Sequence, residues 1–364
     1  MQAMSETSKR QDNFTRIAIV RLGGLGDVVN TLPALDAVRT RWPDARISWL
    51  VESQWLDILP APPRLDEIIA IPKKEWLAKL KNPADLFTLP AEVTALAREL
   101  RARRFDLAID FHGNMRSGVV TALTNARVRV GFAAGYCKEW NYLFTNERHA
   151  VGGGRIHRID RALALCRAIG AEPAGDTPKL DLPDEAREFA RSVFAERELG
   201  TRTVAAIHPG TSAFGSYKRW PAERFRELIQ MLDSRGVVSF ITWGPGEADL
   251  AIEAAAGTGA VVSPPTKSAL QLAALLKECD VFIGADTGPG LVAAAVGTPT
   301  VSIFGPKDPV IYAPRHPRAR VVETPMDCRP CKKRECNDPK CILHITTRHV
   351  AEAAFAVLAE MENN

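Results

Sequence analysis

The segment VFIGADTGPGLVAAAVGTPTVSIF, residues 281–304, decides the fold of this chain. It begins with the apolar run Val281–Ile283, which is typical of a buried strand, and continues through a polar, glycine-containing turn at residues 284–288. An alanine-rich helix is predicted to open at residues 291–296, and a Gly-Thr-Pro triplet ends it before the apolar run at residues 300–304. The order strand, helix, strand is that of a parallel βαβ unit.

The turn inside this unit, Asp286-Thr287-Gly288, is a candidate ligand site. A turn that leads into a helix presents unpaired N–H groups and the positive end of the helix dipole, which suit a phosphate group. It also follows a strand that we expect to be parallel, and open α/β sheets bind ligands at the carboxyl ends of their strands. An ordinary capped helix, with Asp286 or Thr287 as the N-cap, is the alternative that this turn alone leaves open.

Apolar runs alternate with helical patterns along the whole chain, which predicts a doubly wound α/β fold made of parallel βαβ units. Pro33 is expected to kink or restart the first helix. The expected strands are near residues 17–20, 47–51, 68–71, 107–109, 128–131, 203–207, 238–243, 260–263, 280–283 and 300–304, and the expected helices are near 26–41, 91–103, 115–124, 158–169 and 347–361.

The length of 364 residues predicts two domains of ordinary size. A composition of 46% hydrophobic and 25% charged residues is that of a globular protein. Residues 171–184 are rich in Pro, Asp and Gly and are the best candidate for a linker. The expected division is a disordered lead-in at 1–15, an N-terminal domain at 16–177, a C-terminal domain at 178–346 and a last helix at 347–364.

The location expected from the sequence is the cytoplasm. No apolar stretch reaches the roughly 18 residues that a membrane span needs, and the polar first residues lack the apolar core of a signal peptide. Seven cysteines without an export signal fit a reduced protein. The formal charge of +4 permits attraction to an anionic lipid surface but does not by itself indicate a nucleic-acid partner.

Four further motifs accompany the Asp286 turn in a fixed order along the chain. They are the strand, Gly-rich turn and helix within Thr15–Ser53, and the segments Ala205–Ser212, Tyr217–Pro221 and Phe240–Glu247. This ordered set resembles the heptosyltransferases of the inner lipopolysaccharide core, an inverting glycosyltransferase family, from about Arg16 to the C-terminal helix. The resemblance implies two Rossmann-like domains facing across a cleft (the glycosyltransferase-B fold), with the last helix returning towards the N-terminal domain. It also implies an ADP-heptose donor in the C-terminal half and a lipopolysaccharide-precursor acceptor in the N-terminal half.

The Gly-rich turn Gly23-Gly24-Leu25-Gly26-Asp27 matches the family's acceptor loop. By the resemblance, Asp27 is the catalytic base, and Gly24 and Gly26 contact the acceptor. An inverting transfer needs a carboxylate that takes the proton from the attacking hydroxyl. A tight turn with Asp27 favoured by the helix dipole is the simpler interpretation. The family often has hydroxylic residues where Gly23 and Gly24 stand here.

The second matched loop holds Thr211, Ser212 and Lys218, which the resemblance assigns to the donor diphosphate. Hydroxyl and backbone N–H groups can hold the phosphates, and Lys218 can neutralise the charge that grows as ADP leaves. Glu247 resembles the family carboxylate that receives the ribose hydroxyls. The alternatives are a solvated surface lysine and a glutamate that merely begins a helix.

At the Asp286 turn, the residues Asp286, Thr287 and Gly288 match the donor site of the family, with Asp286 expected to face the heptose hydroxyls. Leu291 departs from the pattern, because many members have a histidine there. This chain therefore lacks one donor ligand or supplies it from elsewhere.

Arg116 follows an N-terminal strand, where the family has a basic residue near the acceptor, and an arginine pairs well with inner-core carboxylates. A solvent-facing arginine is the equal alternative. Basic and apolar residues also alternate in a short segment that could lie on the cytoplasmic face of the inner membrane, although an ordinary amphipathic segment is the simpler interpretation. These residues are Lys73, Lys74, Trp76, Leu77, Lys79, Leu80 and Lys81.

We expect no metal and no cofactor, because the family chemistry uses neither. The spacing of Cys328, Cys331, Cys336 and Cys341 nevertheless suits a tetrathiolate site, so free thiols, disulfides and a structural zinc stay open. Two other functions also stay open. A nicotinamide-dependent oxidoreductase is suggested by Gly288-x-Gly290-x-x-Ala293, which starts too far from its strand, and a non-catalytic sugar-nucleotide-binding module is suggested by the departures at Gly23, Gly24 and Leu291.

Overall fold

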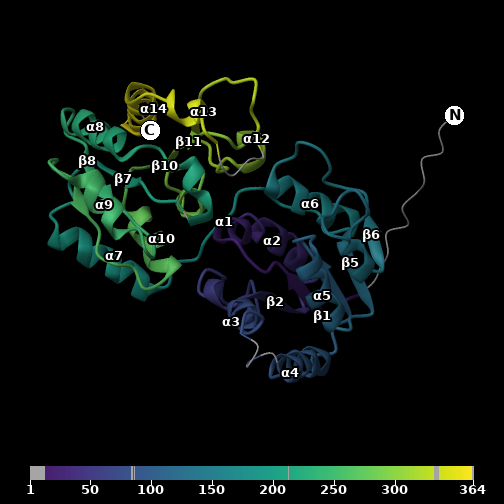
Figure 1. Ribbon diagram of the computed structural model, residues 1–364. Helices are drawn as coiled ribbons and strands as arrows, with labels where there is room; N and C mark the ends of the chain where they lie inside the picture. Colours follow the sequence, from purple (N-terminus) through teal and green to yellow (C-terminus); the bar gives the residue numbers. More distant parts are fainter. Residues whose placement is uncertain (1–12, 83–84, 86, 212, 332–335, 363–364) are drawn as a thin grey trace. The chain divides into compact units, whose positions relative to one another are not determined.

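The computed structural model describes residues 13–82, 85, 87–211, 213–331 and 336–362 (Figure 1). The chain divides into two compact units, one made of Met1–Gly23 with Thr31–Asp176 and the other of Gly24–Asn30 with Thr177–Asn364. Each unit contains one six-stranded sheet whose neighbouring strands all run parallel. The predicted α/β fold with two parallel sheets is therefore confirmed.

The sheet of the first unit has the order β3-β2-β1-β4-β5-β6. Its strands are β1 Arg16–Val20, β2 Arg46–Glu52, β3 Glu67–Ile71, β4 Leu107–Asp110, β5 Val128–Phe132 and β6 Glu147–His149. Its helices are α2 Leu32–Arg41, α3 Lys73–Lys79, α4 Leu89–Ala102, α5 Met115–Leu123 and α6 Arg158–Ala168, and the short 3₁₀ turns are Ser53–Trp55 and Asn141–Phe144. The chain order reverses between β1 and β4, where an open sheet binds its ligands.

The last residues of the lead-in 1–15, which the sequence predicts to be disordered, pack against the first unit. Residues 1–12 lie outside the described part of the chain, but Phe14 is 8% exposed and packs edge-on against Trp42 at 5.5 Å between ring centroids. The backbone N–H of Thr15 donates to Asp106 Oδ2 at 2.8 Å. Residues 14 and 15 are therefore ordered parts of the first unit, because an aromatic side chain there has a core to enter.

The first predicted helix is two helices, α1 Leu25–Val29 and α2 Leu32–Arg41. Pro33 lies in the first turn of α2, where the fixed φ of proline suits a helix. N–H groups of a first turn make no hydrogen bond within the helix, so the absence of this group in proline costs nothing there. The proline therefore restarts the helix. The segment Gly24–Asn30, which contains α1, groups with the second unit, although its place in the sequence predicted the first.

The sheet of the second unit has the order β12-β11-β10-β7-β8-β9. Its strands are β7 Val204–His208, β8 Val238–Ile241, β9 Val261–Val262, β10 Val281–Ala285, β11 Thr300–Phe304 and β12 Arg320–Glu323. Its helices are α7 Asp184–Glu196, α8 Ala222–Asp233, α9 Ala248–Ala255, α10 Ala269–Lys277, α11 Gly288–Ala295, α12 Pro309–Tyr312, α13 Lys340–Leu343 and α14 Thr347–Glu362, with a 3₁₀ turn at Ala213–Lys218.

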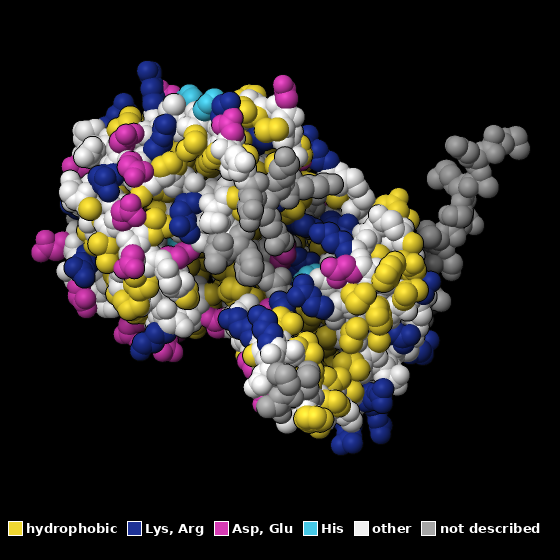
Figure 2. Space-filling view, viewed as in Figure 1, with side chains coloured by type: hydrophobic (Ala, Val, Ile, Leu, Met, Phe, Trp, Pro, Cys, Tyr) yellow, Lys and Arg dark blue, Asp and Glu magenta, His cyan; other side chains and the backbone are white. Residues whose placement is uncertain are grey.

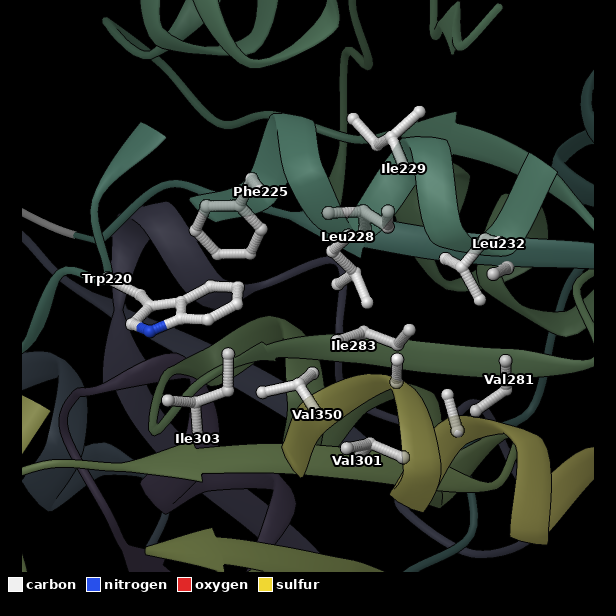
Figure 3. Close-up of a cluster of buried hydrophobic side chains, with 14 of the residues drawn as sticks. Trp220, Phe225, Leu228, Ile229, Leu232, Val281, Ile283, Val301, Ile303 and Val350 are labelled. Carbon is white, nitrogen blue, oxygen red and sulfur yellow. The ribbon is translucent and has the colours of Figure 1, made fainter. Parts of the chain in front are cut away.

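The core of the second unit lies between its sheet, α8 and α14 (Figure 3). Trp220 is fully buried, stacks edge-on against Phe225 and donates its indole N–H to the carbonyl of Ile345 at 2.9 Å. Apolar residues of α14, such as Val350, join the same cluster. The main contacts of α14 are with α8, β10, β11 and β12 of the second unit. The return of this helix towards the N-terminal domain stays a prediction.

The surface carries mixed charge, as the mild net charge of +4 suggests. Figure 2 shows basic and acidic side chains interspersed over the visible face. Within the described ranges, no helix is both long enough and apolar enough to cross a bilayer.

Candidate functional site

Three adjacent strands at the centre of the second sheet, β10, β7 and β8, bring the predicted donor residues to one edge. Gly284 pairs with His208, and Ile207 pairs with Ile241, so these strands end level with one another. The turns that follow them carry Asp286, Thr211 and Glu247. Because the chain order reverses between β7 and β10, this edge is the place where an α/β sheet binds a nucleotide.

Lys218 crosses this edge to the Asp286 turn. Its ammonium Nζ lies 2.8 Å from Asp286 Oδ2 and donates to the Asp286 carbonyl oxygen at 2.9 Å. The two side chains are only 19% and 11% exposed. Lys218 is therefore a mostly buried member of an ion pair and not a solvated surface lysine, and the pair fixes the 3₁₀ turn Ala213–Lys218 against the end of β10.

Glu247 is held in place by groups from the neighbouring turns. His208 Nε2 lies 3.3 Å from Glu247 Oε2, and the N–H of Gly244 donates to the same oxygen at 2.9 Å. Burial by itself would raise the pKa of Glu247, but His208, this N–H and the charge of Arg219 outweigh it and lower the pKa. A side chain at Gly210 would overlap the carboxylate. Glu247 is thus an ionised group fixed beside the β7 turn.

Thr211 lies in the same turn and is 2% exposed. Its hydroxyl oxygen is buried and has no hydrogen-bond partner among the described residues. Ser212, which the sequence pairs with Thr211 as a diphosphate ligand, lies outside the described residues.

The helix α11 begins at Gly288, three residues earlier than predicted, because Pro289 is well suited to a first helical turn. Its N-cap is Thr287, whose hydroxyl donates to the Ala285 carbonyl at 3.2 Å and makes no capping bond. The Thr287 side chain therefore does not occupy the first N–H groups of α11. The positive end of this helix points to the edge that holds Asp286.

The helix that carries Asp27 packs against α11 within the second unit. A Cβ on Gly26 would collide with the side chain of Leu291, and a Cβ on Gly288 would lie 3.1 Å from Leu25 Cβ. Leu291, which stands where the family often has a histidine, thus fills the space above Gly26. Gly24 has a φ of 85°, which glycine adopts without strain, and Asp27 follows it half-buried in the first turn of α1.

Asp110, the other N-terminal carboxylate at a strand end, is fully buried. It accepts hydrogen bonds from the N–H groups of His112 and Gly113, from the Ser117 hydroxyl at 2.8 Å and from the Asn141 amide at 2.7 Å. Burial raises its pKa, and these four bonds oppose the rise. With no exposed surface, Asp110 stabilises the turn into α5 and is not placed to take a proton from a substrate.

Arg116 and the proposed membrane residues lie in the first unit, whereas the other two proposed acceptor residues, Gly24 and Gly26, group with the second. Arg116 is exposed in the first turn of α5. In α3, Lys73 pairs with Glu52 at 2.6 Å, Lys79 pairs with Glu92, and Trp76 packs against the core of the unit. The remaining members of that basic and apolar stretch include two exposed leucines, Leu77 and Leu80.

Metal ligands do not come together in the part of the chain that the structure describes. It contains no group of three or more His, Cys, Asp and Glu side chains arranged to hold an ion. The cysteines of the tetrathiolate-like spacing form no disulfide with one another in the described ranges, namely Cys328, Cys331, Cys336 and Cys341.

Two residues of the donor edge carried no assigned role in the sequence analysis. His208 holds Glu247, and Arg219 donates to the Thr211 carbonyl at 3.3 Å. Both lie inside segments that the sequence singles out, Ala205–Ser212 and Tyr217–Pro221, so the sequence places them near the donor site. Their partners, however, are 39 and 8 residues away in the chain, and only the fold brings them together.

Residues 93–342 match the family described as glycosyltransferase family 9 (heptosyltransferase). Lipopolysaccharide heptosyltransferase 1 of Pseudomonas aeruginosa is 28% identical over 327 residues, which cover 88% of this chain and 87% of that protein. Lipopolysaccharide heptosyltransferase 3 of Escherichia coli K12 is 28% identical over 300 residues, covering 79% of this chain and 82% of that protein.

Two solved structures have the same fold. A family 9 glycosyltransferase from Veillonella parvula superposes with a TM-score of 0.80 at 23% identity and covers 95% of this chain and 97% of its own. The E. coli heptosyltransferase WaaC with ADP has a TM-score of 0.75 at 23% identity and covers 94% of this chain and 100% of its own. The expected glycosyltransferase-B type of fold, with two parallel α/β sheets, is confirmed by these likenesses.

Proposed function

Since the chain belongs to glycosyltransferase family 9, the heptosyltransferases, we propose that it moves a heptose from ADP-heptose to the inner core of lipopolysaccharide. The observation that carries this proposal is the polar edge at the carboxyl ends of β10, β7 and β8, where Lys218 and Asp286 form their ion pair beside the start of α11. The names of the relatives, which are lipopolysaccharide heptosyltransferases, support the choice of sugar and acceptor.

In this proposal, the donor occupies the edge of the second sheet. Thr211, Ser212 and the N-terminus of α11, with Thr287 and Gly288, receive the diphosphate. Among the described residues, the two hydrogen bonds of Lys218 go to Asp286, which leaves its third ammonium N–H for a phosphate oxygen. Glu247 accepts from the ribose hydroxyls, and Asp286 from the hydroxyls of the heptose.

The transfer is an inverting displacement. The acceptor oxygen attacks the anomeric carbon on the face opposite ADP, and the bond from that carbon to the diphosphate oxygen breaks. Asp27 takes the proton of the attacking hydroxyl as general base. Lys218 and the N–H groups of α11 stabilise the negative charge that develops on the departing ADP.

The acceptor is expected at the Gly-rich turn and on the first unit. Gly24 is exposed and lets the acceptor approach the backbone closely, whereas the proposed contact at Gly26 has to be made beside Leu291, which fills the space above it. Arg116 is exposed for a carboxylate of the inner core. The exposed Leu77 and Leu80 near the lysines of α3 would contact the cytoplasmic face of the inner membrane, where the acceptor lipid is anchored.

The activity itself is tested with ADP-heptose and a heptose-deficient lipopolysaccharide acceptor. The expected product is the acceptor with the mass of one added heptose, together with one ADP. Recovery of an unchanged acceptor, while other sugar nucleotides are consumed, would contradict the choice of donor.

The donor is expected to bind without a divalent cation. Lys218 and the helix-start N–H groups supply the positive charge that a metal would otherwise bring to the diphosphate. Isothermal calorimetry with ADP, in excess chelator and in excess Mg²⁺, measures this directly, and the two dissociation constants should agree. Loss of ADP binding in the chelator would contradict a metal-independent site.

A further inference from the structure

The loop that follows β7 contains two buried polar atoms without partners. The hydroxyl oxygen of Thr211 and Nε of Arg219 are both inaccessible to solvent and lack a hydrogen bond among the described residues. Leaving a buried donor without an acceptor is unfavourable, because its hydrogen bond to water is lost and not replaced. The two residues are adjacent in space, because the Arg219 guanidinium donates to the Thr211 carbonyl at 3.3 Å.

The charges around this loop are unequally matched. Asp286 is paired with Lys218 at 2.8 Å, and Glu247 Oε2 lies 3.3 Å from His208 Nε2, a contact that is ionic only if the histidine is protonated. Arg219 has no ion pair among the described residues, although its charge is close enough to lower the pKa of Glu247. Arg219 is therefore a cation of this edge that makes no direct ion pair with a described carboxylate.

Lys218 and Arg219 are neighbours in sequence but contact turns that follow different strands. Lys218 reaches the turn after β10, and Arg219 reaches the turn after β7. These strands are adjacent, with Gly284 opposite His208. An oxygen-rich anion bound at the switch between them would lie between the two cations.

We propose that Arg219 is a donor-site residue whose guanidinium binds the diphosphate beside Thr211. The proposal rests on the proposed function and adds to it the cation that recognises the diphosphate. A guanidinium is well suited to this role because it has several fixed donors and keeps its charge.

The test is calorimetry on the full chain with ADP, AMP and adenosine. Arg219→Gln removes the charge but keeps a polar side chain of similar reach. It is expected to weaken ADP binding about tenfold, which is typical for loss of one charge-assisted hydrogen bond. AMP should lose less, and adenosine should be unaffected. Arg219→Lys should recover part of the affinity for ADP.

Arg226→Gln is the matched control. Arg226 is also half-buried with an unpartnered Nε, but it lies on α8 and donates to the Glu253 carbonyl at 2.9 Å, away from the strand ends. Its replacement should leave ADP binding unchanged. Unfolding temperatures of all variants separate a binding defect from a folding defect.

An equal loss of affinity for ADP and adenosine would overturn the proposal, since Arg219 would then act through Glu247 or through the shape of the loop. Unchanged ADP binding would overturn it as well. If the wild type does not bind ADP but binds UDP or GDP, and Arg219→Gln weakens that binding, the contact of Arg219 with the diphosphate is supported and the proposed ADP-heptose donor is contradicted. If it binds no nucleoside diphosphate, both fall.

Discussion

Asp27→Asn is expected to lower the turnover number by roughly 10²–10⁴-fold and to leave the affinity for ADP-heptose nearly unchanged. Asparagine keeps the shape and polarity of the side chain in the first turn of α1 but cannot accept the proton of the attacking hydroxyl. Asp27 is half-buried in the first turn of α1, whose N-cap is Gly24 with a φ of 85°, and α1 packs against α11. Asparagine has the same size as aspartate and therefore fits the same place. Single-turnover kinetics and donor calorimetry measure the two quantities separately.

Asp36→Asn is the control for this change, because Asp36 is a partly exposed carboxylate of α2 that pairs with Arg64. It should leave turnover at the wild-type level. A folded Asp27→Asn protein with wild-type turnover would remove Asp27 from the mechanism. Loss of donor binding together with turnover would instead mean that Asp27 supports the structure of the Gly-rich turn. Asp110 is no substitute candidate, since it is fully buried and its carboxylate accepts four hydrogen bonds.

Lys218→Ala is expected to weaken ADP binding and slow transfer, each by about 10- to 150-fold. One charge-assisted contact with the leaving group typically contributes ~1.5–3 kcal/mol. A second cost arises because Asp286, which is only 11% exposed, loses the partner of its carboxylate. Steady-state kinetics with varied ADP-heptose, and calorimetry with ADP, would record both effects.

The double variant Lys218→Ala/Asp286→Asn separates these two causes. If the loss of ADP binding comes from an unpaired carboxylate that repels the diphosphate, neutralising Asp286 should restore the affinity. If Lys218 contacts the diphosphate itself, the affinity stays low. Lys277→Ala, at an exposed lysine of α10, should change neither quantity. Wild-type kinetics in Lys218→Ala would show that the ion pair is structural only.

Strong apolar runs made the central strands predictable from the sequence. β1 and β10 are almost wholly buried, and a buried strand has to be apolar along its whole length. β6 and β12 were missed because each is a short edge strand, of three and four residues, with exposed or half-buried polar positions. Edge strands form through pairing with a neighbour, and their own sequence carries little signal.

Two acidic residues of the N-terminal half come after apolar strands. Asp27 lies in the first turn of α1, behind the Gly-rich turn, and Asp110 is the last residue of β4. Asp110 is fully buried, and Asn141, from 31 residues further along the chain, donates to it. Burial depends on which distant segments cover a side chain, so no local pattern could have predicted that the carboxylate of Asp110 is inaccessible.

The sequence alone determined the class of sheet, the turns that carry the candidate site and the family, because apolar periodicity and short motifs are local properties of the chain. Tertiary structure decided which of those polar residues meet. It paired Lys218 with Asp286, fixed Glu247 against His208, and gave Arg219 the Thr211 carbonyl as a partner but no carboxylate from the described part of the chain. These contacts join residues from turns that follow different strands, and their geometry is set by the order and register of the strands in the folded sheet.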